Sequence, residues 1–156
     1  MFPTSVQRVR EFLESKGSKR EIQRLPDSTA TSQQAADALK VEVSQIAKSV
    51  VFGNSNLTVV CVLPGDRRVD SKKVSSIFNS DVLKRLSPDD VKLKTGYVIG
   101  GVCPFALPEN VVLIIDESLK SSSILFAAAG DSHAVVQTSF NELIDITKGS
   151  SGHIVE

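Results

Sequence analysis

The chain has 156 residues, of which 41% are apolar and 23% charged, and its 18 Lys and Arg residues balance 18 Asp and Glu residues. This composition predicts one globular domain over residues 1–156, with a core that needs neither metals nor disulfides. The balanced charge argues against a protein dedicated to DNA, and no apolar run reaches the roughly 18 residues of a membrane span. Charges interrupt every apolar cluster near the N-terminus, so no signal or transit peptide is expected and we expect a cytoplasmic protein.

Helical segments and short strands follow one another in the first half of the chain. Apolar residues at helical spacing, with Ser5 as N-cap and Gly17 after the last turn, predict an amphipathic opening helix. Thr31 and Gln34 form a capping box that begins a second helix. The predicted elements, in order, are a helix at 5–16, a strand at 21–25, a helix at 31–39, a helical turn at 43–47, and strands at 49–52 and 57–63 joined by a hairpin turn at 53–56.

The second half begins with helices and continues as strands between glycine turns. Asp70 is the N-cap of a helix, and Val69 and Val74 form a hydrophobic staple around it. The predicted elements are helices at 70–78 and 81–86, strands at 97–99, 111–115, 124–129 and 134–137, and a final helix at 141–148. We therefore expect an α/β (α+β) fold in which helices surround a mixed, curled β-sheet.

Few residue types in this chain support metal or nucleophilic chemistry. The two Cys and two His residues all lie more than four positions apart, so no metal site and no cofactor are predicted. Cys103 is a candidate nucleophile with His133 as its base. The alternative is that Cys103 is a small buried apolar group.

Two other features are stronger candidates for a functional site. Gly100 and Gly101, followed by Pro104, predict a stiff turn whose bare N–H groups suit an ester carbonyl and its oxyanion. A plain tight connection between strands explains the same glycines. Lys48 comes between apolar residues and a buried-looking strand, so its ammonium group is expected at the end of an element. The alternative is a lysine that complements a helix dipole.

The zero net charge hides a gradient along the chain. Residues 1–100 carry 16 basic and 11 acidic side chains, a net +5, whereas residues 101–156 carry 2 and 7, a net −5. Basic residues gather at 16–24 and at 67–73. Such runs fit either a local contact with a polyanion or a solvated surface.

Four runs of residues occur in a specific order along nearly the whole chain: IAKSVVF at 46–52, LPGDRRV at 63–69, TGYVIGGVCP at 95–104 and IID at 114–116. Together they resemble the YbaK/ProRS-associated domain family of aminoacyl-tRNA deacylases. The resemblance implies that family's fold and an enzyme that hydrolyses the ester between a wrong amino acid and tRNA, acting alone or beside a synthetase. It implies no metal.

The resemblance also implies roles for individual residues. Lys48 would contact the terminal adenosine of the tRNA or its phosphate, and the amides around Gly101 would bind the ester and its oxyanion, which makes these two the expected catalytic residues. A bound water or the substrate's own groups would supply the nucleophile. The expected substrate-binding residues are Thr31, Ser32, Ser49, Gly100, Val102, Pro104 and His133.

The expected substrate is a small mischarged amino acid of the Ala, Ser, Cys or Thr class, held at the acceptor end of a tRNA. The amino-acid pocket of a synthetase discriminates between amino acids of nearly the same shape by only about 1–3 kcal/mol. A second site that hydrolyses the wrong product is therefore needed. The branch that clears Cys-tRNA(Pro) has Ser-Gly-Gly where this chain has Ala128-Ala129-Gly130, which argues against cysteine. Since the sequence shows no acid–base pair, a non-catalytic module that binds aminoacyl-tRNA or a synthetase is the alternative.

Overall fold

The computed structural model describes residues 4–156; the first three residues of the expected domain lie outside the described residues. Its strands form two sheets rather than one. The smaller sheet is antiparallel, with the order β1 (Ile22–Arg24), β7 (Ala134–Thr138), β6 (Leu125–Ala128). The larger, mixed sheet has the order β4 (Lys84–Arg85), β2 (Ala47–Gly53), β3 (Thr58–Pro64), β5 (Val112–Asp116), β8 (Ser150–Gly152).

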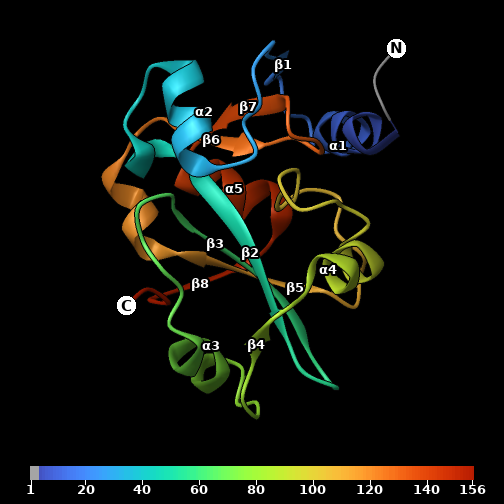
Figure 1. Cartoon of the computed structure of the whole chain (residues 1–156), viewed down its shortest axis with the longest axis vertical. Helices are drawn as coiled ribbons and strands as arrows, with labels where there is room; N and C mark the ends of the chain where they lie inside the picture. Colours follow the sequence, from blue (N-terminus) through green and yellow to red (C-terminus); the bar gives the residue numbers. More distant parts are fainter. Residues whose placement is uncertain (1–3) are drawn as a thin grey trace.

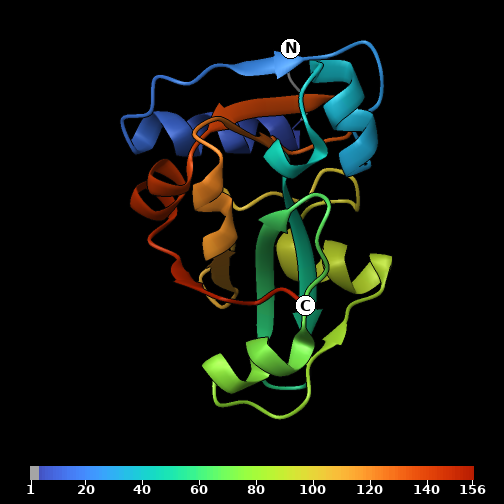
Figure 2. The same ribbon diagram turned by 90° about the vertical axis from the view of Figure 1, so that its left-hand side faces the viewer.

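Helices pack around both sheets, which confirms the expected mixed α+β class. Figures 1 and 2 show the smaller sheet with α1 and α2 at one end of the molecule, and the β2–β3 hairpin running from there toward α3. The α-helices are α1 (Thr4–Ser15), α2 (Ser32–Leu39), α3 (Ser71–Ile77), α4 (Pro88–Thr95) and α5 (Phe140–Thr147), with 3₁₀ turns at Val43–Gln45 and Glu117–Ser121.

Strand β3 is the centre of the core and is buried at every position. Val60 and Val62 belong to the large apolar cluster on one face of the sheet, whereas Val59 and Cys61 belong to the cluster on the other. Because successive side chains point to opposite faces, a strand covered on both faces has an uninterrupted apolar sequence.

The two sheets meet where β2 begins. An isolated β-bridge joins Ile46, just before β2, to Phe126 in β6, and the sheets do not close into a barrel. The large cluster takes side chains from both sheets, so the core runs continuously through this junction. The junction therefore holds elements from distant parts of the sequence in fixed positions.

Most predicted elements are confirmed, including the capping box at Thr31 and the N-cap Asp70. The helical turn expected at 43–47 is a 3₁₀ turn that ends at Gln45, and Ser5 lies inside α1 rather than before it. Strand β8 was not expected.

Two predictions for residues 81–99 are wrong. The segment 81–86 is not a helix but contains β4, because Lys84 and Arg85 pair with the free edge of β2. The strand expected at 97–99 is a turn that follows α4, a helix the sequence analysis missed. Ser87 as N-cap and proline at the first helical position indicate the start of α4. The apolar residues of α4 form no continuous stripe, so the rest of the sequence does not indicate a helix.

Candidate functional site

A cavity of about 80 Å³ lies at the junction of the two sheets, and we call it the first cavity. Its walls come from the start of α2 and the segment before it, the start of β2, the loop after α4, and the paired strands β6 and β7. Of the nine residues expected at the site, six line this cavity: Thr31, Ser32, Lys48, Ser49, Gly100 and Val102. Residues as distant in the sequence as Thr29 and Val135 thus share one concave surface.

Lys48 supplies the positive charge of the first cavity. Its half-buried side chain donates one hydrogen bond, from Nζ to the carbonyl oxygen of Gly65, at 3.2 Å. Burial lowers the pKa of Lys48, the nearby charges of Arg85 and Arg68 lower it further, and Asp66 opposes them. An ammonium group has three N–H donors. Since Lys48 uses one of them within the described residues, two remain for a ligand.

The lowered pKa of Lys48 predicts a stability effect that depends on pH. The ordinary pKa of a lysine is 10.5, and the pKa of Lys48 in the folded protein is lower. The unfolded chain therefore binds the proton of Lys48 more tightly than the folded protein does, so protonation of Lys48 destabilises the fold. We expect Lys48→Met to gain stability relative to the parent at neutral pH, and this gain to shrink as pH rises toward 10.5. Urea unfolding of both proteins across this range measures the difference, and a gain that grows with pH would contradict it.

Side-chain contacts hold the loop after α4, residues 97–105, in a closed shape. Gly96 is the C-cap of helix α4 and has a φ of 81°. The hydroxyl of the fully buried Tyr97 donates to the carbonyl oxygen of Phe105 at 2.6 Å and so ties the two ends of the loop together. Arg8 of α1 lies 4.3 Å from the centre of the Tyr97 ring and donates to the carbonyl oxygen of Thr95 at 3.0 Å. These contacts give the glycine loop a fixed shape.

The loop places its two glycines in different surroundings. Gly100 has a φ of 97°, and a Cβ there would lie 3.1 Å from the Cβ of Ala30. None of the hydrogen bonds among residues 4–156 uses the N–H of Gly100 or of Val102. The N–H of Gly101, by contrast, donates to the carbonyl oxygen of Val98 at 2.9 Å, and Gly101 does not line the cavity. The amides of Gly100 and Val102 are therefore the ones that remain for a ligand.

Removing the Tyr97 hydroxyl tests whether this closure holds the loop. In Tyr97→Phe the carbonyl oxygen of Phe105 loses its hydroxyl donor and keeps only the weak Cys103 Sγ donor at 3.8 Å, which costs about 1–3 kcal/mol of unfolding free energy. For a chain of this length that corresponds to a fall in Tm of roughly 2–10 °C. Differential scanning calorimetry measures the shift, and an unchanged Tm would show that the hydroxyl does not hold the loop closed.

The expected substrate-binding residues Pro104 and His133 and the candidate nucleophile Cys103 do not line the first cavity. Pro104 lines a separate cavity together with Phe12. The His133 ring faces the carbonyl oxygen of Leu25, with Nδ1 at 3.3 Å. Cys103 is completely buried, burial raises its pKa to about 11, and its Sγ faces Phe105 rather than a histidine. These are the surroundings of a buried apolar thiol, not of an activated nucleophile.

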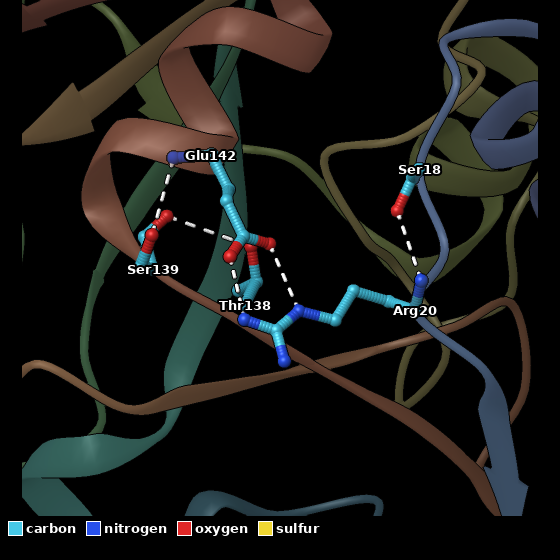
Figure 3. Close-up of polar contacts among 5 residues, drawn as sticks. All are labelled: Ser18, Arg20, Thr138, Ser139 and Glu142. Carbon is cyan, nitrogen blue, oxygen red and sulfur yellow. Dashed lines mark hydrogen bonds and ion pairs between the residues drawn. The ribbon is translucent and has the colours of Figure 1, made fainter.

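Two of the basic residues at 16–24 form ion pairs with acidic side chains. Figure 3 shows the guanidinium of Arg20 against the carboxylate of Glu142, with an Nη2–Oε1 distance of 2.6 Å. Arg24 pairs with Asp131 at the same distance. Arg20 thus connects the segment before β1 to α5, a structural role for one of the residues that formed the run.

The sequence analysis missed the apolar wall of the first cavity. Phe126, Ala127 and Ala128 of β6 line it together with Ala30 and Ala35. From the sequence, Ala128 and Ala129 were considered only as a departure from a family motif. No group of three or more His, Cys, Asp or Glu side chains in residues 4–156 is arranged to hold a metal ion, and no helix there is long and apolar enough to cross a membrane.

Comparisons with known proteins bear on the same region. The pattern of a protein family described as aminoacyl-tRNA editing domain matches residues 26–146. YwhH of Bacillus subtilis, an uncharacterised protein, is 33% identical over 92% of this chain and 91% of its own length. EbsC of Enterococcus faecalis, provisionally named a Cys-tRNA(Pro)/Cys-tRNA(Cys) deacylase, is 25% identical over 80% of this chain and 76% of its own.

Two further similarities involve prolyl-tRNA synthetases. Proline–tRNA ligase of Leuconostoc citreum is 31% identical over 64% of this chain, which spans 17% of that enzyme. A solved structure, provisionally described as a trans-editing enzyme for prolyl tRNA synthetase, has a TM-score of 0.90 and 30% identity, and covers 100% of this chain and 99% of its own. The similarity therefore covers the first cavity and both sheets around it.

Proposed function

Starting from the fact that the chain belongs to the aminoacyl-tRNA editing domain family, we propose that it hydrolyses the ester of a small mischarged amino acid on tRNA. The resemblance inferred from the sequence motifs is confirmed by that match, and the family acts on mischarged tRNA. The proposed substrates carry Ala, Ser, Cys or Thr, and the proposed partners are the acceptor end of the tRNA and a synthetase.

One observation supports this proposal above the others: Lys48 and the glycine loop line the same cavity. An ester between an amino acid and a nucleotide needs a cation for the phosphate side and hydrogen-bond donors for the carbonyl oxygen. Lys48 supplies the first, and the amides of Gly100 and Val102 supply the second.

The proposed reaction is an attack of water on the ester carbonyl. The water oxygen bonds to the carbonyl carbon, and the negative charge that develops on the carbonyl oxygen is stabilised by the loop amides. The bond to the ribose oxygen then breaks, and the proton released by the water goes to that oxygen. Lys48 is the sole ionisable side chain among the cavity's described lining residues, so the substrate's own amine or hydroxyl is proposed to orient the water.

The walls of the first cavity favour a small side chain. Its volume is about 80 Å³, and its lining includes the alanines of β6 and α2 together with Val135 of β7. A hydrophobic pocket distinguishes one methylene by about 1–3 kcal/mol, so selection against larger amino acids is proposed to come from exclusion by these walls.

A non-catalytic binding module is the second candidate. It is favoured by the lack of a carboxylate or histidine among the described residues that line the first cavity. Such a module would hold aminoacyl-tRNA through the same amides and lysine without turnover.

A deacylation panel distinguishes the two functions. Purified protein is mixed with tRNAs for proline, threonine and alanine, each charged with Ala, Ser, Cys or Thr, and release of the amino acid is followed over time. We expect release of at least one small amino acid well above the spontaneous rate, and little release of the cognate amino acid. Stable binding of these tRNAs without release would favour the binding module instead.

A further inference from the structure

Helix α1 contacts the glycine loop, although it lies outside the segment that the family pattern matches. The pattern covers residues 26–146, whereas α1 spans Thr4–Ser15, so the pattern assigns no role to this helix. Ser5, Arg8 and Phe12 follow one another at intervals of three and four residues, and they therefore lie on one face of α1. Each of the three contacts the loop or the turn that supports it.

Arg8 holds the start of the loop. Its Nη2 donates to the carbonyl oxygen of Thr95 at 3.0 Å, and its guanidinium carbon lies 4.3 Å from the centre of the Tyr97 ring. Gly96 lies between these two residues, and a Cβ there would lie 2.6 Å from Nη1 of Arg8. The guanidinium therefore packs against three consecutive residues where α4 ends and the loop begins.

The other two contacts of α1 reach the far end of the loop and its support. The ring of Phe12 lies 6.3 Å from the ring of Phe105, measured between their centres. The backbone of Ser5 is so close to Gly130 that a Cβ on Gly130 would lie 2.8 Å from the carbonyl oxygen of Ser5. Gly130 itself packs against Gly101. Helix α1 thus supports the loop at its beginning, at its end and, through this turn, in its middle.

Arg8 carries a charge that no acidic side chain of residues 4–156 neutralises. The guanidinium forms no ion pair within these residues, and its buried Nε has no hydrogen-bond partner among them. A half-buried cation without a counter-ion costs free energy, which the contacts with Thr95 and Tyr97 offset. Burial raises the pKa of Cys103, the residue after Val102, and the charge of Arg8 is among the effects that lower it, so the field of this cation reaches the loop.

We propose that Arg8 is a positioning residue for the reaction: its guanidinium fixes the start of the glycine loop and thereby the direction of the amides of Gly100 and Val102. The inference rests on the proposed function, since these amides are the proposed donors to the ester oxygen. Arg8 does not line the first cavity, so it acts through the loop and not by touching the substrate. Loss of its contacts should therefore slow the chemical step and leave the binding of tRNA unchanged.

Steady-state kinetics on one mischarged tRNA compares three variants of α1 with the parent. Arg8→Met removes the guanidinium and keeps an unbranched side chain, whereas Arg8→Lys keeps the charge without the planar group that stacks on Tyr97. Gln7→Met is the matched control, because the amide of Gln7 donates to Glu11 on the same helix.

We expect kcat to fall about tenfold in Arg8→Met and roughly threefold in Arg8→Lys, which restores part of the hydrogen bonding, with KM unchanged in both. Gln7→Met should keep the parent values of kcat and KM. A change confined to KM would show that Arg8 binds the tRNA directly and would overturn the proposal, as would an equal loss of kcat in Arg8→Met and Gln7→Met.

Amide hydrogen exchange followed by NMR tests the same inference without turnover. The N–H of Gly101 donates to the carbonyl oxygen of Val98 within the loop, so its exchange rate reports how often the loop opens. We expect exchange of this amide to be about tenfold faster in Arg8→Met and unchanged in Gln7→Met. The amide of Val74 in α3, at the other end of the molecule (Figures 1 and 2), should keep its rate in both variants.

The two measurements separate this inference from the proposed function. An unchanged exchange rate of the Gly101 amide in Arg8→Met, or equal acceleration of the Gly101 and Val74 amides, would overturn the role of Arg8 even in a protein that deacylates tRNA. Faster exchange at Gly101 alone, in a chain that fails the deacylation panel, would refute the proposed function and leave the hold of Arg8 on the loop in place.

Discussion

Lys48→Ala is expected to lower kcat/KM for deacylation by about 10- to 100-fold. The variant removes the cation of the first cavity, and a hydrogen bond to a charged group contributes about 1.5–3 kcal/mol. Most of the loss should be in KM if the amine holds the phosphate in the ground state, and in kcat if the contact forms only in the transition state. Steady-state kinetics on one mischarged tRNA measures both parameters.

Two control variants accompany Lys48→Ala. Lys48→Arg keeps the charge and should retain part of the activity, while Lys92→Ala removes an exposed lysine of α4 and should match the parent. Circular dichroism should show the same fold in all of them. Full activity in Lys48→Ala would exclude its proposed role.

Gly101→Ala is the second variant with a large expected effect, although Gly101 does not line the first cavity. A Cβ at this position would lie 2.6 Å from the Cα of Asp131 and 2.8 Å from the carbonyl oxygen of Gly130. Both are backbone atoms, so the loop and the turn before β7 must move apart. We expect about 1–3 kcal/mol of lost stability and, because the amides of Gly100 and Val102 shift with the loop, roughly a hundredfold loss of kcat.

Gly152→Ala provides the comparison for Gly101→Ala. Its Cβ would meet the end of the Ile77 side chain at 3.2 Å, which can move, and the end of the Ile114 side chain at 3.5 Å, an ordinary contact distance. Urea unfolding and deacylation rates of both variants separate a steric effect at the loop from a general cost of adding a methyl group. Equal behaviour of the two variants would show that the close packing of Gly101 has no functional consequence.

Gly100 and Gly101 contribute to the loop in different ways. Gly101 packs against the 130–131 turn and its N–H donates to Val98, so we propose that it acts through the position of its neighbours. Gly100 lines the first cavity and has a free N–H within the described residues. We therefore propose Gly101 as a positioning residue and the amides on either side of it as the oxyanion donors.

The family, the mixed fold and the position of most elements could be predicted from the sequence, because these depend on local signals. Apolar spacing, the capping box at Thr31 and the N-cap Asp70 act over a few residues and leave a readable pattern. The family resemblance identified six residues that the structure brings into one cavity.

Other features were decided by contacts between distant segments. The segment 81–86 contains β4 because Lys84 and Arg85 pair with the free edge of β2, and no local signal at Ile46 indicates that it will form an isolated bridge with Phe126. Likewise, only the folded loop determines that the N–H of Gly101 donates to Val98, whereas the N–H groups of Gly100 and Val102 have no partner among the described residues. Local patterns thus determined which elements form and which residues carry chemistry, whereas long-range packing decided which of those residues share a cavity.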